Sequence, residues 1–448
     1  MLVGESRSPL FPAITMPHLA GLELPKIRRV AIQQPIEESL NDLEGRVGEA
    51  LKGCQKLQSL SLGDRVAISV GSRGIAQIQE VTKTVVDYLK QEQLHPFIVP
   101  AMGSHGGGTA EGQIKVLRKL GIDEKSMDCE VRSSMKTVDY GPISPGIHCH
   151  FDENAAHSDG IVIINRIKAH TSFPRDIESG LIKLIAVGLG KAEGARAVHR
   201  TGPKGLEVFL PKLAEKALQH APISAGLALV ENSNKQLCHI EGVEPEAIFE
   251  TDKRLLKKAK ALMPRMPFEQ LDALIVEEFG KDVSGSGLDP FVTGRTDIRG
   301  VENPAKPFIH KIAGLRLTQA TDGNGMGTGM LDYLPQKTAN QLDLQAMYMN
   351  SVSATILEKA FIPIVLANDR EVVQALTATC WQQEKNSIRM AHIGSTLQLN
   401  EMFLTEPLFQ EALDRGVVLS HSETENFRFD DEGDLMNRLI LEQERISS

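Results

Sequence analysis

Cysteine is scarce in this chain, and no two cysteines are spaced for metal binding. The five residues, Cys54, Cys129, Cys149, Cys238 and Cys380, are scattered without a Cys-x-x-Cys pair. This spacing argues against a zinc ribbon, an iron–sulfur cluster and a disulfide framework. It indicates reduced thiols with mostly structural roles.

Long hydrophobic runs are missing as well. No stretch approaches the roughly eighteen apolar residues of a membrane-spanning helix, and residues 1–17 lack the charged-then-apolar pattern of a signal peptide. We therefore expect a cytoplasmic protein with no membrane partner. The formal net charge of −9, the pI near 5.9 and the lack of a basic stripe with interleaved aromatics argue against a nucleic-acid partner.

The chain has the length and composition of a globular protein with two domains. Its 448 residues, 41% hydrophobic and 24% charged, exceed the usual size of a single core. Prolines at both ends of the segment 264–267 indicate a hinge or linker. We predict an N-terminal domain over residues 1–265 and a C-terminal domain over residues 266–448.

Short apolar runs alternate with amphipathic stretches, which predicts two α/β domains. Strands are expected at 64–70, 96–101, 160–165 and 271–276, and helices at 75–91 and 109–120. The continuous apolar character of 160–165 indicates a strand buried on both faces. The N-terminal domain is therefore predicted to be doubly wound with a mostly parallel sheet. Ligands of such sheets bind beyond the carboxyl ends of the strands, and we expect the active site in the cleft between the domains.

One segment of this acidic chain is locally basic. Residues 159–204 hold eight Lys or Arg against four Asp or Glu. A positive pocket in an acidic protein indicates an anionic ligand. Within this segment Lys183 stands in the apolar run 181–187, which is costly for an ammonium group unless the amine is paired or chemically modified.

Three further candidates follow predicted strands. Arg73 comes after the first strand, His105 lies in the glycine-rich loop 103–108 after the second, and His170 follows the strand at 160–165. Each has an ordinary alternative: a surface arginine, a loop histidine bonded to solvent, and an interior histidine with satisfied hydrogen bonds. Glycines in a loop could equally serve a phosphate.

Together these segments resemble the nickel-dependent lactate racemase family, whose members carry the lactate racemase N-terminal domain. Four patterns in order carry the resemblance: Gly103-Ser104-His105, Ala169-His170, Ser179-Gly180-Leu181-Ile182-Lys183, and His199, sixteen residues after Lys183. Each pattern alone is weak, whereas their common order and spacing are specific. The resemblance covers about residues 60–260.

The resemblance implies a cofactor, a metal and a reaction. Lys183, with Ser179 and Gly180 beside it, would carry a nickel-pincer nucleotide (nickel pyridinium-3,5-bisthiocarboxylic acid mononucleotide), and His199 would complete the nickel site. His105 and His170 would be the acid/base pair of a 2-hydroxyacid racemase or epimerase that works by hydride transfer through a 2-keto acid. The N-terminal domain would anchor the cofactor, and the C-terminal domain would close over the substrate.

The implied partners are a small anionic 2-hydroxy acid, clamped by Arg73, and the enzymes that build the cofactor. A homo-oligomer is compatible with this reading. The choice between racemisation and epimerisation stays open.

This sequence departs from the family pattern at positions that the family uses near the substrate. The family has an aspartate at the position of Val70, and it places the lysine closer to the second histidine than the thirteen residues found here. A Tyr-Gln-x-x-Lys motif early in the second domain is missing, and Lys281 or Arg295 would have to replace its lysine. We therefore expect a substrate other than lactate, such as a sugar acid.

Two other classes of function remain open. One is a non-catalytic protein that binds a nucleotide or a hydroxy acid on the same fold. The other is an NAD-dependent dehydrogenase, but its Gly-x-Gly-x-x-Gly signature is not matched by the spacing of Gly188, Gly190 and Gly194. Bound nickel would favour the racemase, and tight NAD binding would favour the dehydrogenase.

Overall fold

The computed structural model describes residues 10–440 apart from residues 73, 171–174, 200, 201, 203 and 204. The chain divides into two compact units. The central unit comprises Pro35–Met263, and the split unit comprises Met1–Gln34 together with Pro264–Ser448. Among the described residues, no helix is long and apolar enough to cross a membrane.

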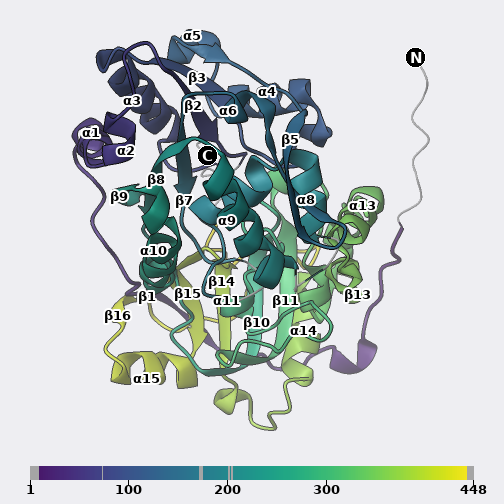
Figure 1. The fold of residues 1–448 in the computed structure, drawn as a ribbon. Helices are drawn as coiled ribbons and strands as arrows, with labels where there is room; N and C mark the ends of the chain where they lie inside the picture. Colours follow the sequence, from purple (N-terminus) through teal and green to yellow (C-terminus); the bar gives the residue numbers. More distant parts are fainter. Residues whose placement is uncertain (1–9, 73, 171–174, 200–201, 203–204, 441–448) are drawn as a thin grey trace. The chain divides into compact units, whose positions relative to one another are not determined.

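The central unit is built on a six-stranded sheet in the order β4-β3-β2-β7-β8-β9 (Figure 1). All neighbours are parallel except β8 and β9, which pair antiparallel. The strands are β2 (Arg65–Val70), β3 (His95–Pro100), β4 (Glu130–Val131), β7 (Gly160–Arg166), β8 (Ile223–Glu231) and β9 (Leu237–Val243). A separate hairpin is formed by β5 (Thr137–Ser144) and β6 (Ile147–Asp152).

Helices cover both faces of this sheet. Val162 and Ile164 of β7 share a core with α1 (Leu43–Lys52) and α3 (Ile78–Gln91), while Ile161 and Ile163 are buried on the opposite face. The other helices of the unit are α2 (Gln55–Gln58), α4 (Ala110–Lys119), α5 (Glu124–Met127), α6 (Glu153–Ala156), α7 (Leu181–Lys183), α8 (Lys191–His199), α9 (Leu210–His220) and α10 (Ile248–Leu262). The predicted doubly wound, mostly parallel arrangement is confirmed.

The split unit holds an eight-stranded sheet in the order β13-β12-β11-β10-β14-β15-β1-β16. Strands β13 to β14 in this order are parallel, and the remaining pairs are antiparallel. The strands are β1 (Ile27–Ile32), β10 (Gln270–Phe279), β11 (Phe308–Leu317), β12 (Tyr333–Pro335), β13 (Ile364–Leu366), β14 (Met390–Ser395), β15 (Gln398–Thr405) and β16 (Val418–His421). Its helices are α11 (Pro290–Thr293), α12 (Gln336–Ala339), α13 (Leu344–Ala354), α14 (Asp369–Ala378) and α15 (Glu406–Asp414).

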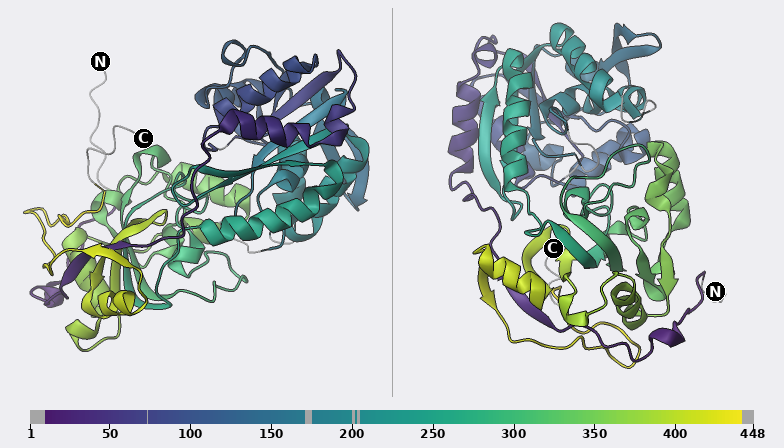
Figure 2. Two further views of the ribbon diagram at one scale, coloured as in Figure 1. Left: turned by 90° about the vertical axis from the view of Figure 1, so that its left-hand side faces the viewer. Right: turned by 90° about the horizontal axis from the view of Figure 1, so that it is seen from below.

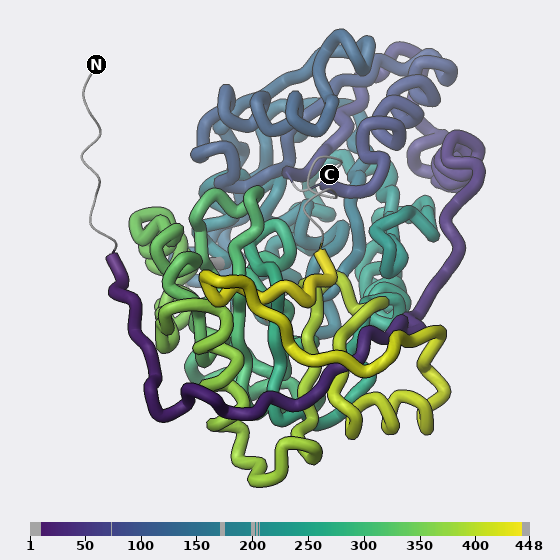
Figure 3. Tube along the Cα trace, turned by 180° about the vertical axis from the view of Figure 1, so that it is seen from behind, coloured from purple at the N-terminus to yellow at the C-terminus, as the bar shows by residue number. Residues whose placement is uncertain are grey.

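One part of the predicted domain division needs correction. The first 34 residues were assigned to the N-terminal domain, but they belong to the split unit. Strand β1 pairs on one side with β15 and on the other with β16, and the purple N-terminal segment lies beside the yellow C-terminal segment (Figures 2 and 3). The cause is long-range strand pairing, with Val30 and Ile32 buried in the core of the split unit.

Candidate functional site

The chain order of the central sheet creates a topological switch point. From β2 the chain continues to β3 and β4 on one side, and then returns to β7 on the other side of β2. Because these strands are parallel, their carboxyl ends lie at the same edge, where ligands of open α/β sheets bind. Ser72, His105 and His170 follow the carboxyl ends of β2, β3 and β7, respectively.

The segments after β2 and β3 are joined directly. The hydroxyl oxygen of Ser72 lies 2.6 Å from Nδ1 of the exposed His105. Two residues before His105, the Gly103 amide donates to the Gly188 carbonyl at 3.0 Å. Gly103 has a φ of +59°, and an added Cβ would lie 3.1 Å from the Val187 carbonyl oxygen. The loop that carries His105 therefore needs glycine to reach the segment that follows Lys183.

A buried lysine stabilises the start of the same loop. The ammonium group of Lys191 lies 2.8 Å from the Asp152 carboxylate and donates to the Pro100 carbonyl at 2.6 Å. Gln113, which is also a partner of Lys191, donates from Nε2 to the Gly103 carbonyl at 2.9 Å. Burial raises the pKa of Asp152 and lowers the pKa of Lys191, while their attraction opposes both shifts. This network fixes the start of the His105 loop.

His170 is positioned through its backbone. Its amide donates to the carboxylate of Glu178, which also accepts from the Arg175 amide at 2.7 Å and from the Lys260 ammonium group at 2.5 Å. The Glu178 side chain is only 1% exposed. A buried carboxylate with three donors therefore holds the half-buried His170 after β7.

Ser179 and Gly180 position the backbone that leads to Lys183. Ser179 forms an isolated bridge with Lys168, whose amide donates to the Ser179 carbonyl at 2.9 Å. The side-chain amide of Asn165 donates to the Gly180 carbonyl at 2.5 Å. A Cβ at Gly180 would lie 2.5 Å from an oxygen of Asp252. These contacts account for a small residue at position 180 without invoking a ligand.

The carboxyl group of Asp252 caps the short helix that ends at Lys183. It accepts from the amides of Leu181 at 3.1 Å and Ile182 at 2.9 Å. Burial raises the pKa of Asp252 to about 7, although the two amide hydrogen bonds lower it. Because Asp252 occupies these amides, the amino end of α7 is not available to a phosphate group.

Lys183 lies at the junction of α7 with a π-helical turn. The segment Leu184–Gly188 adopts i→i+5 geometry, which is rare and frequently found at functional sites. Residues on both sides of Lys183 (Leu181, Ile182, Leu184, Ile185 and Ala186) are buried, whereas the Lys183 side chain is partly exposed. A partly exposed lysine between buried neighbours fits a point of covalent attachment.

Two of the predicted site residues are not described in full. Arg73 lies outside the described residues. His199 ends helix α8, but its side chain also lies outside them. In the described part of the chain, no group of three His, Cys, Asp or Glu side chains is arranged to hold a metal ion.

The two candidates in the split unit have different surroundings. Lys281 follows the carboxyl end of β10 and donates to the Asn350 side chain at 2.5 Å. Arg295 pairs with Asp332 at 2.8 Å and donates to the His310 carbonyl at 2.6 Å, near the amino end of β11. Arg295 thus has a structural role at the edge opposite to Lys281, and we do not retain it as a substrate-binding residue.

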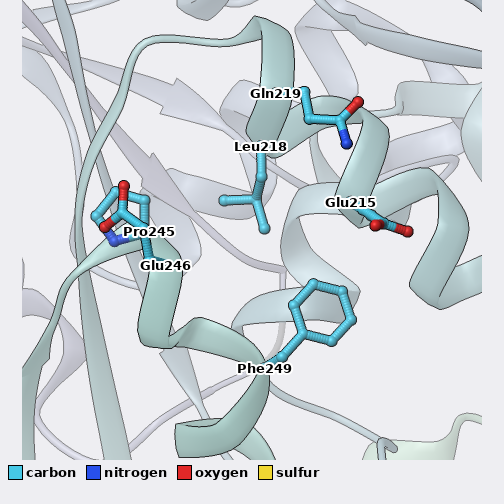
Figure 4. A pocket seen from close by; sticks show the side chains of 6 residues that line it. All are labelled: Glu215, Leu218, Gln219, Pro245, Glu246 and Phe249. Atoms are coloured by element: carbon cyan, nitrogen blue, oxygen red, sulfur yellow. The ribbon is translucent and has the colours of Figure 1, made fainter.

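A hollow of about 350 Å³ in the central unit lies elsewhere (Figure 4). Its lining residues come from α9, α10 and the turn between β9 and α10. They are Glu215, Leu218, Gln219, Pro245, Glu246 and Phe249. Helix α9 ends just before β8 begins, so the hollow lies at the amino edge of the sheet. Its two carboxylates do not suit an anionic substrate.

Sequence reasoning missed the residues that support the site. Lys191, Asp152, Gln113, Glu178 and Asp252 are all buried, and each pairs with groups far along the chain. The signal that could have identified Lys191 is its position after Gly190 in an otherwise small and apolar run. The partners of Asp152 and Asp252 leave no local pattern.

The chain has a distant structural relative and no sequence match. No protein-family model matches the chain, and no curated protein sequence matches it. The structure of the lactate racemase apoprotein from Thermoanaerobacterium thermosaccharolyticum is similar over 83% of this chain and 88% of that chain, with 13% sequence identity and a TM-score of 0.45. A likeness this distant carries no conclusion about function.

Proposed function

We propose that this protein is a racemase or epimerase that inverts the C2 carbon of a 2-hydroxy acid, with a nickel-pincer nucleotide attached to Lys183. The proposal rests on one observation. Motifs separated by about eighty residues in the sequence lie in segments that meet at the switch point of the central sheet. His105 contacts Ser72, the second residue after β2, and the chain that follows Lys183 contacts the loop of His105 through Gly188.

The attachment point suits the cofactor. Lys183 is partly exposed, and the backbone just before it is held by Asn165 at the Gly180 carbonyl and by Asp252 at the next two amides. His199, eight residues after Lys191 on α8, would supply an imidazole donor of the kind that nickel accepts. When bound, the cofactor would supply reversible hydride acceptance at C2 of the substrate.

The two histidines would move the hydroxyl proton. In one direction His105 or His170 takes the proton from the substrate hydroxyl, and in the other direction a histidine returns a proton to the carbonyl oxygen of the 2-keto acid. An imidazole with its ordinary pKa of about 6.5 can do both near neutral pH. The hydrogen bond with Ser72 orients the His105 ring, and Glu178 fixes the backbone of His170.

The substrate would be an anionic 2-hydroxy acid larger than lactate. Arg73 would bind its carboxylate in a bidentate manner, and Lys281 would be a second cationic contact. Val70, which stands where the family has aspartate, is fully buried in the hydrophobic core and cannot contact a substrate. A sugar acid, whose extra hydroxyl groups replace the contacts of that aspartate, is consistent with this change.

The test is intact-protein mass spectrometry with nickel analysis, on protein co-expressed with the cofactor-building enzymes. We expect an adduct of nucleotide size on Lys183 and about one nickel per chain. Lys183→Ala should abolish the adduct, whereas Lys257→Ala, a change of an exposed lysine on α10, should leave it intact. Peptide mapping locates the modified residue.

The acid/base assignment has its own variants. His105→Ala and His170→Ala should keep the adduct but lower turnover of the substrate at least about 100-fold. An adduct that persists in Lys183→Ala would show that the anchor is wrong. An unmodified wild-type chain, under conditions that load a known family member, would refute the racemase proposal and favour a binding protein.

A further inference from the structure

The β5–β6 hairpin of the central unit presents two histidines on one face. His148 and His150 alternate along β6 with the buried Cys149 and Phe151. Since side chains two residues apart in a strand point to the same side, the two imidazoles are neighbours. Their rings are stacked with centroids 6.4 Å apart.

Each of the two imidazole rings is held by a hydrogen bond at its own Nδ1 atom. Nδ1 of His148 lies 2.7 Å from the Asp139 carboxylate, and Nδ1 of His150 lies 3.2 Å from the Thr137 hydroxyl oxygen. Asp139 is also the direct cross-strand partner of His150. Among the described residues, neither Nε2 atom has a hydrogen-bond partner.

This pattern is typical of histidines that bind metals. A metal-binding imidazole usually donates its other ring N–H to a carboxylate or another oxygen, which fixes the tautomer and aims the lone pair at the metal. The Asp139 carboxylate requires a proton on Nδ1 of His148, and therefore leaves the lone pair of the neutral ring on Nε2.

A hollow of about 480 Å³ lies against these residues and reaches helix α8. Asp139, His148 and His150 line one side, and Glu193 and Arg196 of α8 line the other. The Glu193 carboxylate accepts two hydrogen bonds from Arg196, at 2.8 and 2.9 Å. The hollow therefore offers space for a hydrated ion beside the two imidazoles.

We propose that the hairpin binds a divalent transition-metal ion of the Zn²⁺ or Ni²⁺ class through Nε2 of His148 and His150. Water completes the coordination, because the described residues contain no pre-arranged group of three protein ligands. Imidazole donors favour these ions over Mg²⁺ and Ca²⁺, which prefer oxygen ligands. The proposed site uses neither Lys183 nor His199 as a ligand, and it does not depend on the proposed racemase function.

Calorimetric titration of the full-length apoprotein with ZnCl₂ and NiCl₂ tests the proposal. The protein is made without the cofactor-building enzymes and is treated with a chelator beforehand. We expect one binding event that is lost in both His148→Ala and His150→Ala. Asp139→Asn should weaken binding by about 10-fold, because it removes the carboxylate that orients His148.

Two control variants separate this site from others. His157→Ala removes an exposed histidine outside the hairpin, and His199→Ala removes the proposed nickel ligand; both should bind as the wild type does. Circular dichroism confirms that each variant is folded, and Asp139→Asn tests the site with both imidazoles retained. Absence of binding to the wild type, or unchanged binding in His148→Ala and His150→Ala, would overturn the proposal.

Discussion

Asp252 is a buried acid at the amino end of the short helix that ends at Lys183. It lies on α10, is 3% exposed, and has only two backbone amides as hydrogen-bond donors among the described residues. Its pKa is raised to about 7 by burial. The folded state therefore holds a proton on this group at pH values where the unfolded chain has released it.

This shift makes the stability of the central unit depend on pH. The contribution of a group with a raised pKa is fully present below the unfolded value of 3.8 and is lost as the pH rises to about 7. Between pH 5 and pH 8, the free energy of unfolding of the wild type should fall relative to Asp252→Asn by on the order of 2 kcal/mol. Urea unfolding at both pH values measures this difference.

An exposed acid serves as the comparison for this prediction. Asp176→Asn removes an exposed carboxylate from the same unit, and it controls for the loss of one acidic side chain. Asp252→Asn also loses one acceptor for two amides, but that cost is common to pH 5 and pH 8. A pH-independent difference for Asp252→Asn would show that the carboxyl group is ionised in the fold.

At the scale of single residues, the sequence offers candidates for chemistry but gives no sign of the buried residues that hold their loops in place. His105, His170 and Lys183 are candidates because their positions after strands or in an apolar run stand out locally, and their roles stay predictions. The sequence gives no comparable sign of Lys191, which is fully buried, whereas Lys183 is partly exposed. The partner of Lys191 is Asp152, which lies 39 positions earlier in the chain, so no local pattern connects them.

The π-helical turn after Lys183 depends on one close backbone approach. A Cβ at Gly188 would lie 2.7 Å from the Ala101 carbonyl oxygen and 3.0 Å from Cδ1 of Leu184. Gly188→Ala should therefore lower the free energy of unfolding by about 1–3 kcal/mol, as overpacking does. It should also displace the loop of His105, because the Gly188 carbonyl accepts from the Gly103 amide.

A glycine in open surroundings provides the control. No atom lies within 4 Å of a Cβ at Gly48 in the middle of α1. Gly48→Ala should raise stability by about 0.5–1 kcal/mol through helix propensity. Thermal unfolding of both variants measures the two changes in stability. Equal changes would mean that the turn accommodates the added methyl group without loss of stability.

At the scale of elements, regular patterns were predictable and irregular ones were not. The strands predicted at 64–70, 96–101 and 160–165 correspond to β2, β3 and β7. The helix predicted at 109–120 corresponds to α4, which Thr109 caps by accepting from the Gly112 amide. The β5–β6 hairpin was missed because glycines and prolines at positions 141–146 interrupt its alternation.

The division of the whole molecule is discontinuous in sequence. Strand β1 joins the split unit through register pairs such as Val30 with Met402, which lie more than 350 positions apart. A six-residue strand of mixed polarity carries no signal of such a distant partner. This explains why a boundary placed at the proline-flanked segment left the first residues in the wrong domain.

Val30 provides a test of this division because it is fully buried in the core of the split unit. In Val30→Asp, an unpaired carboxylate replaces an apolar side chain, which should lower the stability of that unit by at least about 3 kcal/mol. Hydrogen exchange measured by mass spectrometry should then accelerate in β10, β14 and β15, while β2 and β7 keep their protection. Ile36→Asp, at a position 68% exposed in the central unit, should change neither set of strands. If Val30→Asp instead accelerated hydrogen exchange in β2 and β7 and left exchange in β14 and β15 unchanged, residues 10–34 would belong to the central unit. The reason is that exchange accelerates in the strands whose core the substitution disrupts.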